Sequence, residues 1–521
     1  MGTDDWVSHY DVCRRLFTFC AEAQLTQGMT EGAVISAKEV LTHGKSFHDK
    51  LPAHQALLTA FTIQGNHVDA INHGMLVLRE FGEDFPTDTD EQQAASKTEL
   101  MRICGVLGSK SFDDIVNQYP METGSTQMLM MQHLMVVARI AYNKDPTLMI
   151  LLVFRMVSKS MTLGLTAEAS FAFAALAFAL CGLGKYELSS FYARVASALL
   201  QKFSQKYSHI VQLLLNSSIL LYTQPQQACA EQLYAAYEDA MSMGAVEWAL
   251  INLSRSLYAS LFAPSPNSTL EDYSKRIVKG LETNLTNKHE LNALYIQVLC
   301  QAVRNLTSKD ETSDPLSNLT CDEQKVSKFT PQSQLHIMRK SLAFRVWFGR
   351  LFGKYDGMKE LIEELQSMVA RNPFTPPMDT HNDYFHIGLV AFAMLRMDDS
   401  GREYWDNITS DVMKKFEAWI EIGNEWNFNS KMQLLLAERA YCKNDVDVAK
   451  TAYDEAIAKA RHTGFIHEEA LACELAGRFY CERGDISEGR SYLHDSVALY
   501  TRWGAHRKAI HVRSLLRNFH C

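Results

Sequence analysis

The chain has 521 residues and a mass of 59.0 kDa, enough for several ordinary domains or for one long repeat array. Hydrophobic residues make up 47% of it and charged residues 21%, which excludes collagen-like, disordered and purely coiled-coil chains. Its 51 Lys and Arg against 60 Asp and Glu give a formal charge of -9, so we expect no nucleic-acid partner.

The amino-terminal residues, MGTDDWVSHYDVCRRLF, lack the basic segment and apolar core of a secretory signal, so we expect a cytoplasmic location. The best candidate for a membrane segment, residues 169–184, is a run of 16 uncharged residues, shorter than the roughly 20 residues of a membrane-spanning helix. We therefore expect a buried helix there and no membrane partner. The 11 cysteines form no C-x-x-C pair, which indicates reduced thiols rather than a zinc site or a disulfide framework.

Helical periodicity runs through nearly the whole chain. Only 12 residues are proline, and long proline-free stretches repeat apolar residues every three or four positions. The segment 307–332 is polar and lacks this periodicity, so we predict an exposed loop between a helical array at 1–306 and a second array at 333–521. A shorter interruption is predicted at 371–383. The predicted fold class is all-α.

Five segments share one pattern of a helix, a turn and a second helix. In chain order, the turns lie at Gly65, Gly184, Gly353, Asn444 and Gly484. The long gap between the first two turns has room for further, degenerate units of about 40 residues each. A helix pair cannot bury its apolar face alone, so the pairs are expected to stack into a solenoid.

The last unit, residues 470–505, has the clearest pattern of small side chains. Gly477 lies in its first predicted helix, and Gly489 and Ser496 lie in the second. The preceding unit has Ala437 and Ala449 at the matching places. These offsets resemble the tetratricopeptide motif, in which small residues let paired antiparallel helices approach closely. The resemblance implies a tetratricopeptide-like antiparallel helix-pair solenoid, an α-α superhelix.

Residues 472–515 resemble something more particular than a generic repeat. They are similar to the closing repeat of large signalling proteins in which an AAA-type or Orc1-like predicted ATPase is followed by a helical repeat region, often with sensor and kinase domains. Residues 65–86 are similar to the repeat that opens the same region. The closing resemblance is carried by Gly477, Phe479, Tyr480, Gly484, Tyr492, Leu493, Tyr500, Trp503, Gly504, Ala505 and Lys508.

The nucleotide-binding loop of that family, G-x-x-x-x-G-K-[ST], does not occur in this sequence. The nearest segment, HGKS at 43–46, has Glu39 at the place of the first glycine. A second segment, CGLGK at 181–185, is interpreted as a turn between repeat helices. Kinase, hydrolase, metalloprotease and calcium-loop signatures are also absent. We therefore expect no enzyme activity, no catalytic residues, no cofactor and no metal.

Two further features have competing interpretations. His381 and His386, beside Asp383, could converge on a metal ion, but we expect a loop histidine followed by a helical one. The tail after Arg502 has basic residues and no acidic ones, and could contact an acidic partner. The favoured interpretation is a capping helix, with its basic residues in water, that covers the last repeat with an apolar stripe of Ala509, Val512, Leu515 and Leu516.

The predicted function is a non-enzymatic interaction scaffold of tetratricopeptide type in intracellular signalling, which captures a protein or peptide segment in its concave groove. An ATPase or kinase would be its partner or would belong to a longer parent chain. The alternatives are a repeat-region fragment of such a signalling ATPase or hybrid kinase, and an enzyme with an unrecognised site in the groove. The repeat template places seven side chains in the groove: Lys340, Trp347, Arg350, Glu438, Tyr441, Glu474 and Arg478.

Overall fold

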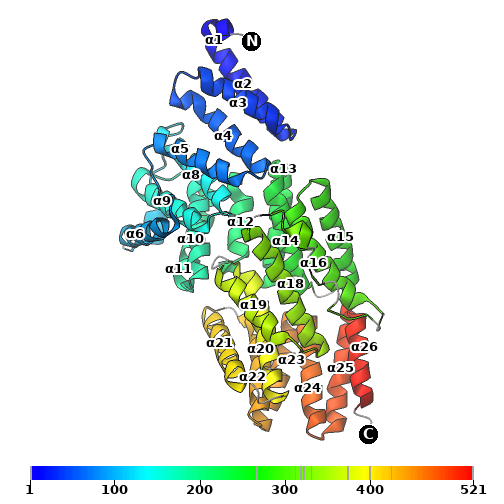
Figure 1. The fold of residues 1–521 in the computed structure, drawn as a ribbon. Coiled ribbons are helices and arrows are strands. Elements are labelled where there is room, and N and C mark those ends of the chain that lie inside the picture. The colour runs from blue at the N-terminus through cyan, green and yellow to red at the C-terminus, as the bar shows by residue number, and fades with distance from the viewer. Residues whose placement is uncertain are drawn as a thin grey trace. The chain divides into compact units, whose positions relative to one another are not determined.

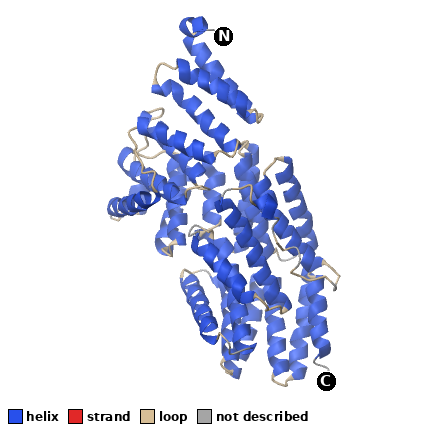
Figure 2. Ribbon diagram, in the orientation of Figure 1, coloured by secondary structure: helices blue, strands red, loops and turns tan. Residues whose placement is uncertain are grey.

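The computed structural model describes residues 3–518, except 109, 143, 204, 266–267, 311–312, 317–318, 321–322, 330, 372–374, 398–400 and 424. Within these residues every regular element is a helix, and the helices pack in pairs (Figures 1 and 2). The only β-type pairing in the described part is an isolated bridge between Pro120 and Leu165. The all-helical prediction is confirmed.

The contacts divide the chain into two compact units, Met1–Leu176 with Phe191–Tyr207, and Ala177–Ser190 with Ser208–Cys521. The predicted loop at 307–332 lies inside the second unit. Helices α10 and α11 contribute residues to both units. The first unit contains α1 (Thr3–Ser8), α2 (Tyr10–Thr26), α3 (Thr30–His43), α4 (Phe47–Ile63), α5 (His67–Glu80), α6 (Thr89–Leu107), α7 (Phe112–Val116), α8 (Thr126–Ala141), α9 (Pro146–Leu163), much of α10 (Glu168–Gly182) and α11 (Tyr186–Phe203), and the 3-10 helix η1 (Gln205–Tyr207).

The second unit contains the longest run of regular helix pairs, from α13 with α14 to α24 with α25. Its remaining elements are α12 (Ser208–Asn216), the 3-10 helix η2 (Ile219–Tyr222), α13 (Gln226–Ser242), α14 (Val246–Phe262), α15 (Leu270–Thr286), α16 (Glu290–Thr307), α17 (Glu323–Val326), α18 (Pro331–Phe352), α19 (Met358–Arg371), α20 (Pro377–Met397), α21 (Arg402–Glu421), α22 (Glu425–Cys442), α23 (Val446–Thr463), α24 (Ile466–Glu482), α25 (Ile486–Trp503) and α26 (His506–Asn518).

All five predicted turns lie between two helices and have positive φ at the predicted residue. At Gly484, for example, the amide of Gly484 donates to the Cys481 carbonyl and the amide of Asp485 donates to the Tyr480 carbonyl, both at 3.0 Å. This left-handed ending satisfies carbonyls that the helix leaves free. Further turns of this type, which the sequence analysis missed, occur at Gly28, Gly244 and Lys288.

Helices α24 and α25 approach so closely that glycine is required at their crossing. A Cβ atom on Gly489 would lie 2.7 Å from the Gly477 carbonyl oxygen, and one on Gly477 would lie 2.8 Å from the Gly489 carbonyl oxygen. The Ser496 hydroxyl donates to the Ala470 carbonyl across the same pair at 2.8 Å. In α13 and α14 the Ser256 hydroxyl donates to the Ala230 carbonyl in the same way, also at 2.8 Å.

The two predicted interruptions are more structured than expected. In the described part of 307–332, α17 forms and Leu319 and Val326 are buried. The Ser341 hydroxyl of α18 donates to the Leu319 carbonyl, which holds this segment against the helix. The second interruption is short because α20 begins at Pro377, a residue type suited to the first helical turn.

The carboxyl-terminal helix α26 packs on α25, as the capping interpretation requires, and it also contacts α16 and α18 (Figure 1). Ala509, Val512 and Leu516 are buried. The expectation that the basic residues of this helix stay in water was wrong for Arg507 and Lys508, which are both buried. Arg507 donates to the Ser313 carbonyl, and Lys508 donates to the Leu351 carbonyl at the end of α18.

One helix of the described chain, α9, is long and apolar enough to cross a membrane. Of its residues, 61% are buried inside the fold. A core helix of a water-soluble protein has the same length and composition, so α9 alone is weak evidence for a membrane segment. Most of the apolar stretch at 169–184 lies in α10: residues 169–181 are buried, as expected, and residues 182–184 are exposed at its end.

Replacing Gly489 by alanine should destabilise the second unit by about 1–3 kcal/mol, because the added methyl group would overlap backbone atoms of α24. The matched control is Gly105→Ala in α6, where nothing lies within 4 Å of the new methyl group. That change should stabilise its helix by up to about 1 kcal/mol. Urea unfolding followed by circular dichroism measures both, and equal effects would contradict the close approach.

Candidate functional site: the inner helices of the second unit

Six helices of the second unit, α14, α18, α20, α22, α24 and α26, bring charged side chains into its interior. We call them the inner helices. Their charged residues are buried in ion pairs with one another rather than exposed to water. Buried charges are stable only when they are paired and hydrogen-bonded, so these pairs restrict how the inner helices can pack.

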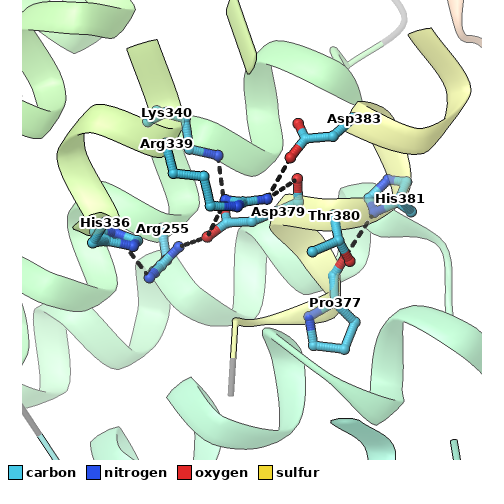
Figure 3. Close-up of polar contacts among 9 residues, drawn as sticks. All are labelled: Arg255, His336, Arg339, Lys340, Pro377, Asp379, Thr380, His381 and Asp383. Atoms are coloured by element: carbon cyan, nitrogen blue, oxygen red, sulfur yellow. Dashed lines mark hydrogen bonds and ion pairs between the residues drawn. The ribbon is translucent and has the colours of Figure 1, made fainter. Parts of the chain in front are cut away.

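The first group, the Asp379 cluster, joins α14, α18 and α20 (Figure 3). The Asp379 carboxylate is fully buried and accepts hydrogen bonds from Arg255 at 2.6 Å and from Lys340 at 3.0 Å. Arg339 donates to the Asp379 carbonyl at 3.1 Å and to the Asp383 carboxylate. Lys340 also lies 3.6 Å from the centre of the Tyr258 ring.

Burial and ion pairing act in opposite directions on these groups. Burial raises the pKa of Asp379, but Arg255, Lys340 and Arg339 together bring this pKa well below its usual value. Burial lowers the pKa of Lys340 to about 8, although Asp379 opposes the shift. Burial also raises the pKa of Asp383 to about 6, against the opposing charge of Arg339.

Two histidines border the Asp379 cluster and are held neutral. His336 stacks on Tyr295 with ring centres 5.3 Å apart, and its Nε2 lies 3.3 Å from the Arg255 guanidinium. His381 Nδ1 lies 3.1 Å from the Pro377 carbonyl, and its Nε2 lies 3.2 Å from the Gln226 side-chain oxygen. Burial lowers the pKa of each histidine to about 3.

His381 and His386 both lie in α20, so the expectation that His381 is a loop residue was wrong. The two histidines are five residues apart on one helix, and His381 makes its contacts with the Pro377 carbonyl and Gln226. In the part of the chain that the structure describes, no three His, Cys, Asp or Glu side chains are placed to hold a metal ion.

The second group, the Arg350 cluster, consists of Arg350, Arg396, Glu438, Glu474, Arg478 and Lys508. The Glu438 carboxylate lies 2.7 Å from Arg396 and accepts a 2.6 Å hydrogen bond from the Tyr453 hydroxyl. The Glu474 carboxylate accepts from Arg478 at 2.7 Å and from Lys508 at 2.9 Å. This cluster joins α18, α20, α22, α24 and α26.

Arg350 lies between these two sets of ion pairs. Its side chain is 2% exposed, and Nη1 donates to the Tyr355 hydroxyl at 3.3 Å. Among the described residues, Nε has no hydrogen-bond partner and no carboxylate lies within 4.0 Å of the guanidinium. Burial lowers the pKa of Arg350, but the charges of Tyr355, Glu438 and Glu474 raise it overall. The cluster therefore contains three arginines and two carboxylates, together with Lys508, whose pKa burial lowers to about 7.

A small cavity lies between the inner helices, with room for about one water molecule. Aromatic side chains form much of its wall, among them Trp347 and Trp503. Three lining side chains, Asn382, His386 and His467, each have a buried nitrogen atom without a hydrogen-bond partner among the described residues. Burial lowers the pKa of His467 to about 4 and that of His386 well below its usual value, so both rings are neutral.

All seven residues predicted to line the groove belong to the second unit. Lys340 is in the Asp379 cluster and Trp347 lines the cavity. Tyr441 lies beside Arg396, whose guanidinium is 4.6 Å from the centre of the Tyr441 ring. Those in the Arg350 cluster are Arg350, Glu438, Glu474 and Arg478.

In the described structure these seven residues do not line an open groove. Five are buried, with exposed fractions from 0 to 4%, and only Tyr441 and Arg478 are partly exposed. The buried residues contact other inner helices, including α26, which the repeat template does not contain.

Sequence reasoning missed Asp379, Arg255, Arg396 and Lys508. A signal for Lys508 exists, because it is one turn before Val512 on the apolar stripe of α26 and thus occupies a buried position. A charged residue on an otherwise apolar helix face points to a buried ion pair. Nothing comparable in the sequence identifies which carboxylate it meets.

The search against protein-family models finds no match to this chain, and the search of curated proteins finds none either. What the protein does must therefore be inferred from its own residues. The two charged clusters are the features of the described chain that place the most chemistry together.

The Lys508→Met variant tests the burial of Lys508, whose pKa burial lowers from 10.5 to about 7. Between these values the unfolded chain binds more protons than the folded protein, so stability should rise with pH. Relative to Lys508→Met, the wild type should gain up to about 1.4 kcal/mol per pH unit in this window. Urea unfolding from pH 7 to 10 measures the difference in the free energy of unfolding between the two proteins. A difference that does not change with pH would show that Lys508 is not buried in its neutral form.

The cavity should hold one ordered water molecule in a crystal structure at high resolution. The Asn382 amide can donate to it, and the water can donate to Nδ1 of His386 and of His467. Both neutral rings should then carry their proton on Nε2, which ¹⁵N NMR of the histidines detects. An empty cavity, or rings protonated on Nδ1, would contradict this arrangement.

Proposed function

We propose that the protein is a non-enzymatic interaction scaffold of tetratricopeptide type. The second unit would capture a polypeptide segment at the partly exposed edge of the Arg350 cluster, formed by Arg396, Tyr441 and Arg478. The observation that carries the proposal is that residues from five helices converge on this cluster while these three side chains stay partly open to solvent.

Repeated packing supports the tetratricopeptide type. Helix pairs recur along the second unit, and the first helix of several pairs ends in the same type of left-handed turn. Small residues or serine hydroxyls lie where the paired helices are closest. Repeats of this type stack on their neighbours and expose long surfaces for binding other proteins. The resemblance to the repeat region of AAA/Orc1-like signalling proteins adds an ATPase or kinase as the proposed partner or parent chain, and a cytoplasmic setting.

The side chains at the edge are of the kinds that dominate protein interfaces. Tyrosine and arginine are enriched among residues whose truncation costs the most binding energy. The Arg396 and Arg478 side chains are each 22% exposed, and the Tyr441 ring packs against Phe479 with ring centres 5.0 Å apart. Packing against neighbours holds these side chains in place before binding, which lowers the entropy cost of association.

The buried acids and bases support a structural role within the scaffold. Asp379 and Glu474 each accept hydrogen bonds from two or more side chains of the same chain, and Glu438 accepts one from Tyr453 and forms an ion pair with Arg396. Their charge is used to hold helices together.

A cross-linked pull-down from the native cell extract tests the proposal. The variant Tyr441→Ala with Arg478→Gln should lose the proteins that the wild type retains, because it removes two of the three edge side chains. The control Tyr119→Ala with Arg461→Gln changes the same residue types at exposed positions that do not belong to the cluster, and it should retain them. Matching protein sets for all three proteins, with unchanged melting curves, would exclude this edge as the binding surface.

A further inference from the structure

From the charge balance of the Arg350 cluster we infer that the captured segment is acidic, with Asp or Glu side chains that complete the cluster. This inference deepens the proposed function and rests on it. Inside the cluster, three arginines, Arg350, Arg396 and Arg478, face only two carboxylates, Glu438 and Glu474. A partner carboxylate would supply the missing negative charge.

The two carboxylates of the cluster are already paired with other side chains, although Oε2 of Glu438 accepts no hydrogen bond from the described residues. Glu438 is shared by Arg396 and Tyr453, and Glu474 is shared by Arg478, Lys508 and the Tyr500 hydroxyl at 3.3 Å. Neither forms an ion pair within 4.0 Å of the Arg350 guanidinium. Arg350 is thus a buried cation whose nearest polar partner is a neutral hydroxyl, an arrangement that favours an additional anion.

Donors for a carboxylate are present at the edge as well as in the interior. At the edge, the Arg396 and Arg478 side chains are each 22% exposed, while the Nε atoms of Arg350 and Arg478 are buried and have no hydrogen-bond partner among the described residues. Arginine binds carboxylates through charge-assisted hydrogen bonds from its guanidinium group. Tyr441 would pack against the aliphatic part of a Glu side chain, as tyrosine does at many interfaces.

Neighbouring edge residues do not cancel this charge. The Glu482 carboxylate accepts from the neutral Tyr441 hydroxyl and keeps its negative charge, but the adjacent Arg483 guanidinium, which donates to Asn444 at 2.7 Å, offsets it. The whole chain carries a formal charge of -9, so attraction of an acidic segment must act locally. Within the cluster the distances are shorter than the screening length of about 8–10 Å at physiological salt.

The probe is a fluorescein-labelled peptide with four consecutive glutamates between glycine and serine residues, and its control has four glutamines. Fluorescence anisotropy with the full chain should show binding of the glutamate peptide alone, weakened by added salt. Arg478→Gln should weaken binding of the glutamate peptide about tenfold or more, because the loss of one charge-assisted hydrogen bond has an effect of that size. Arg478→Lys keeps the charge and should weaken it less. Arg461→Gln, which removes an exposed arginine paired with Glu469, should leave it unchanged.

Equal binding of the two peptides, or an Arg478→Gln variant that binds like the wild type, would overturn the inference. The inference would also be overturned if inorganic triphosphate displaced the peptide and bound more tightly than the peptide does, because the preferred anion would then be a phosphate. The cellular pull-down separates the two proposals. If the edge variant loses its partners but the glutamate peptide does not bind, capture at the edge stands and the acidic chemistry falls.

Discussion

The second unit depends on one constraint: charges taken out of water must be paired. Asp379 is fully buried, and it meets Arg255 of α14 and Lys340 of α18 from its own position in α20. Removing one partner would leave a buried charge uncompensated, at a cost of about 3–5 kcal/mol. The pairs therefore specify which helices face one another, while the apolar contacts around them supply most of the driving force.

The same pairing closes the inner face that repeat proteins commonly use for binding. Lys508 connects α26 to α18 and α24, and its helix contacts α16 as well. An open superhelix would have a groove along these inner helices. Here the space between them is a small cavity with room for about one water molecule. Recognition is therefore proposed at the edge, where the Arg350 cluster reaches solvent through Arg396, Tyr441 and Arg478.

This arrangement links folding and recognition through a single set of residues. Arg478 holds Glu474, and Glu474 holds Lys508 of the terminal helix. A ligand that engages Arg478 would share it with a buried carboxylate, so binding and the seating of α26 are coupled through one charge. The excess of cations over carboxylates gives that ligand its expected sign.

The sequence by itself determined the helical class, the five turns and the small-residue crossing at Gly477 and Gly489, because these depend on spacing along one helix pair. It also selected Arg350, Glu438 and Glu474 as inward-facing positions. It did not show that they face one another, nor that Asp379, Arg396 and Lys508 complete them. Those partners are up to 157 residues apart, as for Lys508 and the Leu351 carbonyl. Which distant helices meet is decided by tertiary packing, since a helical repeat pattern is the same whether its inner face is open or closed.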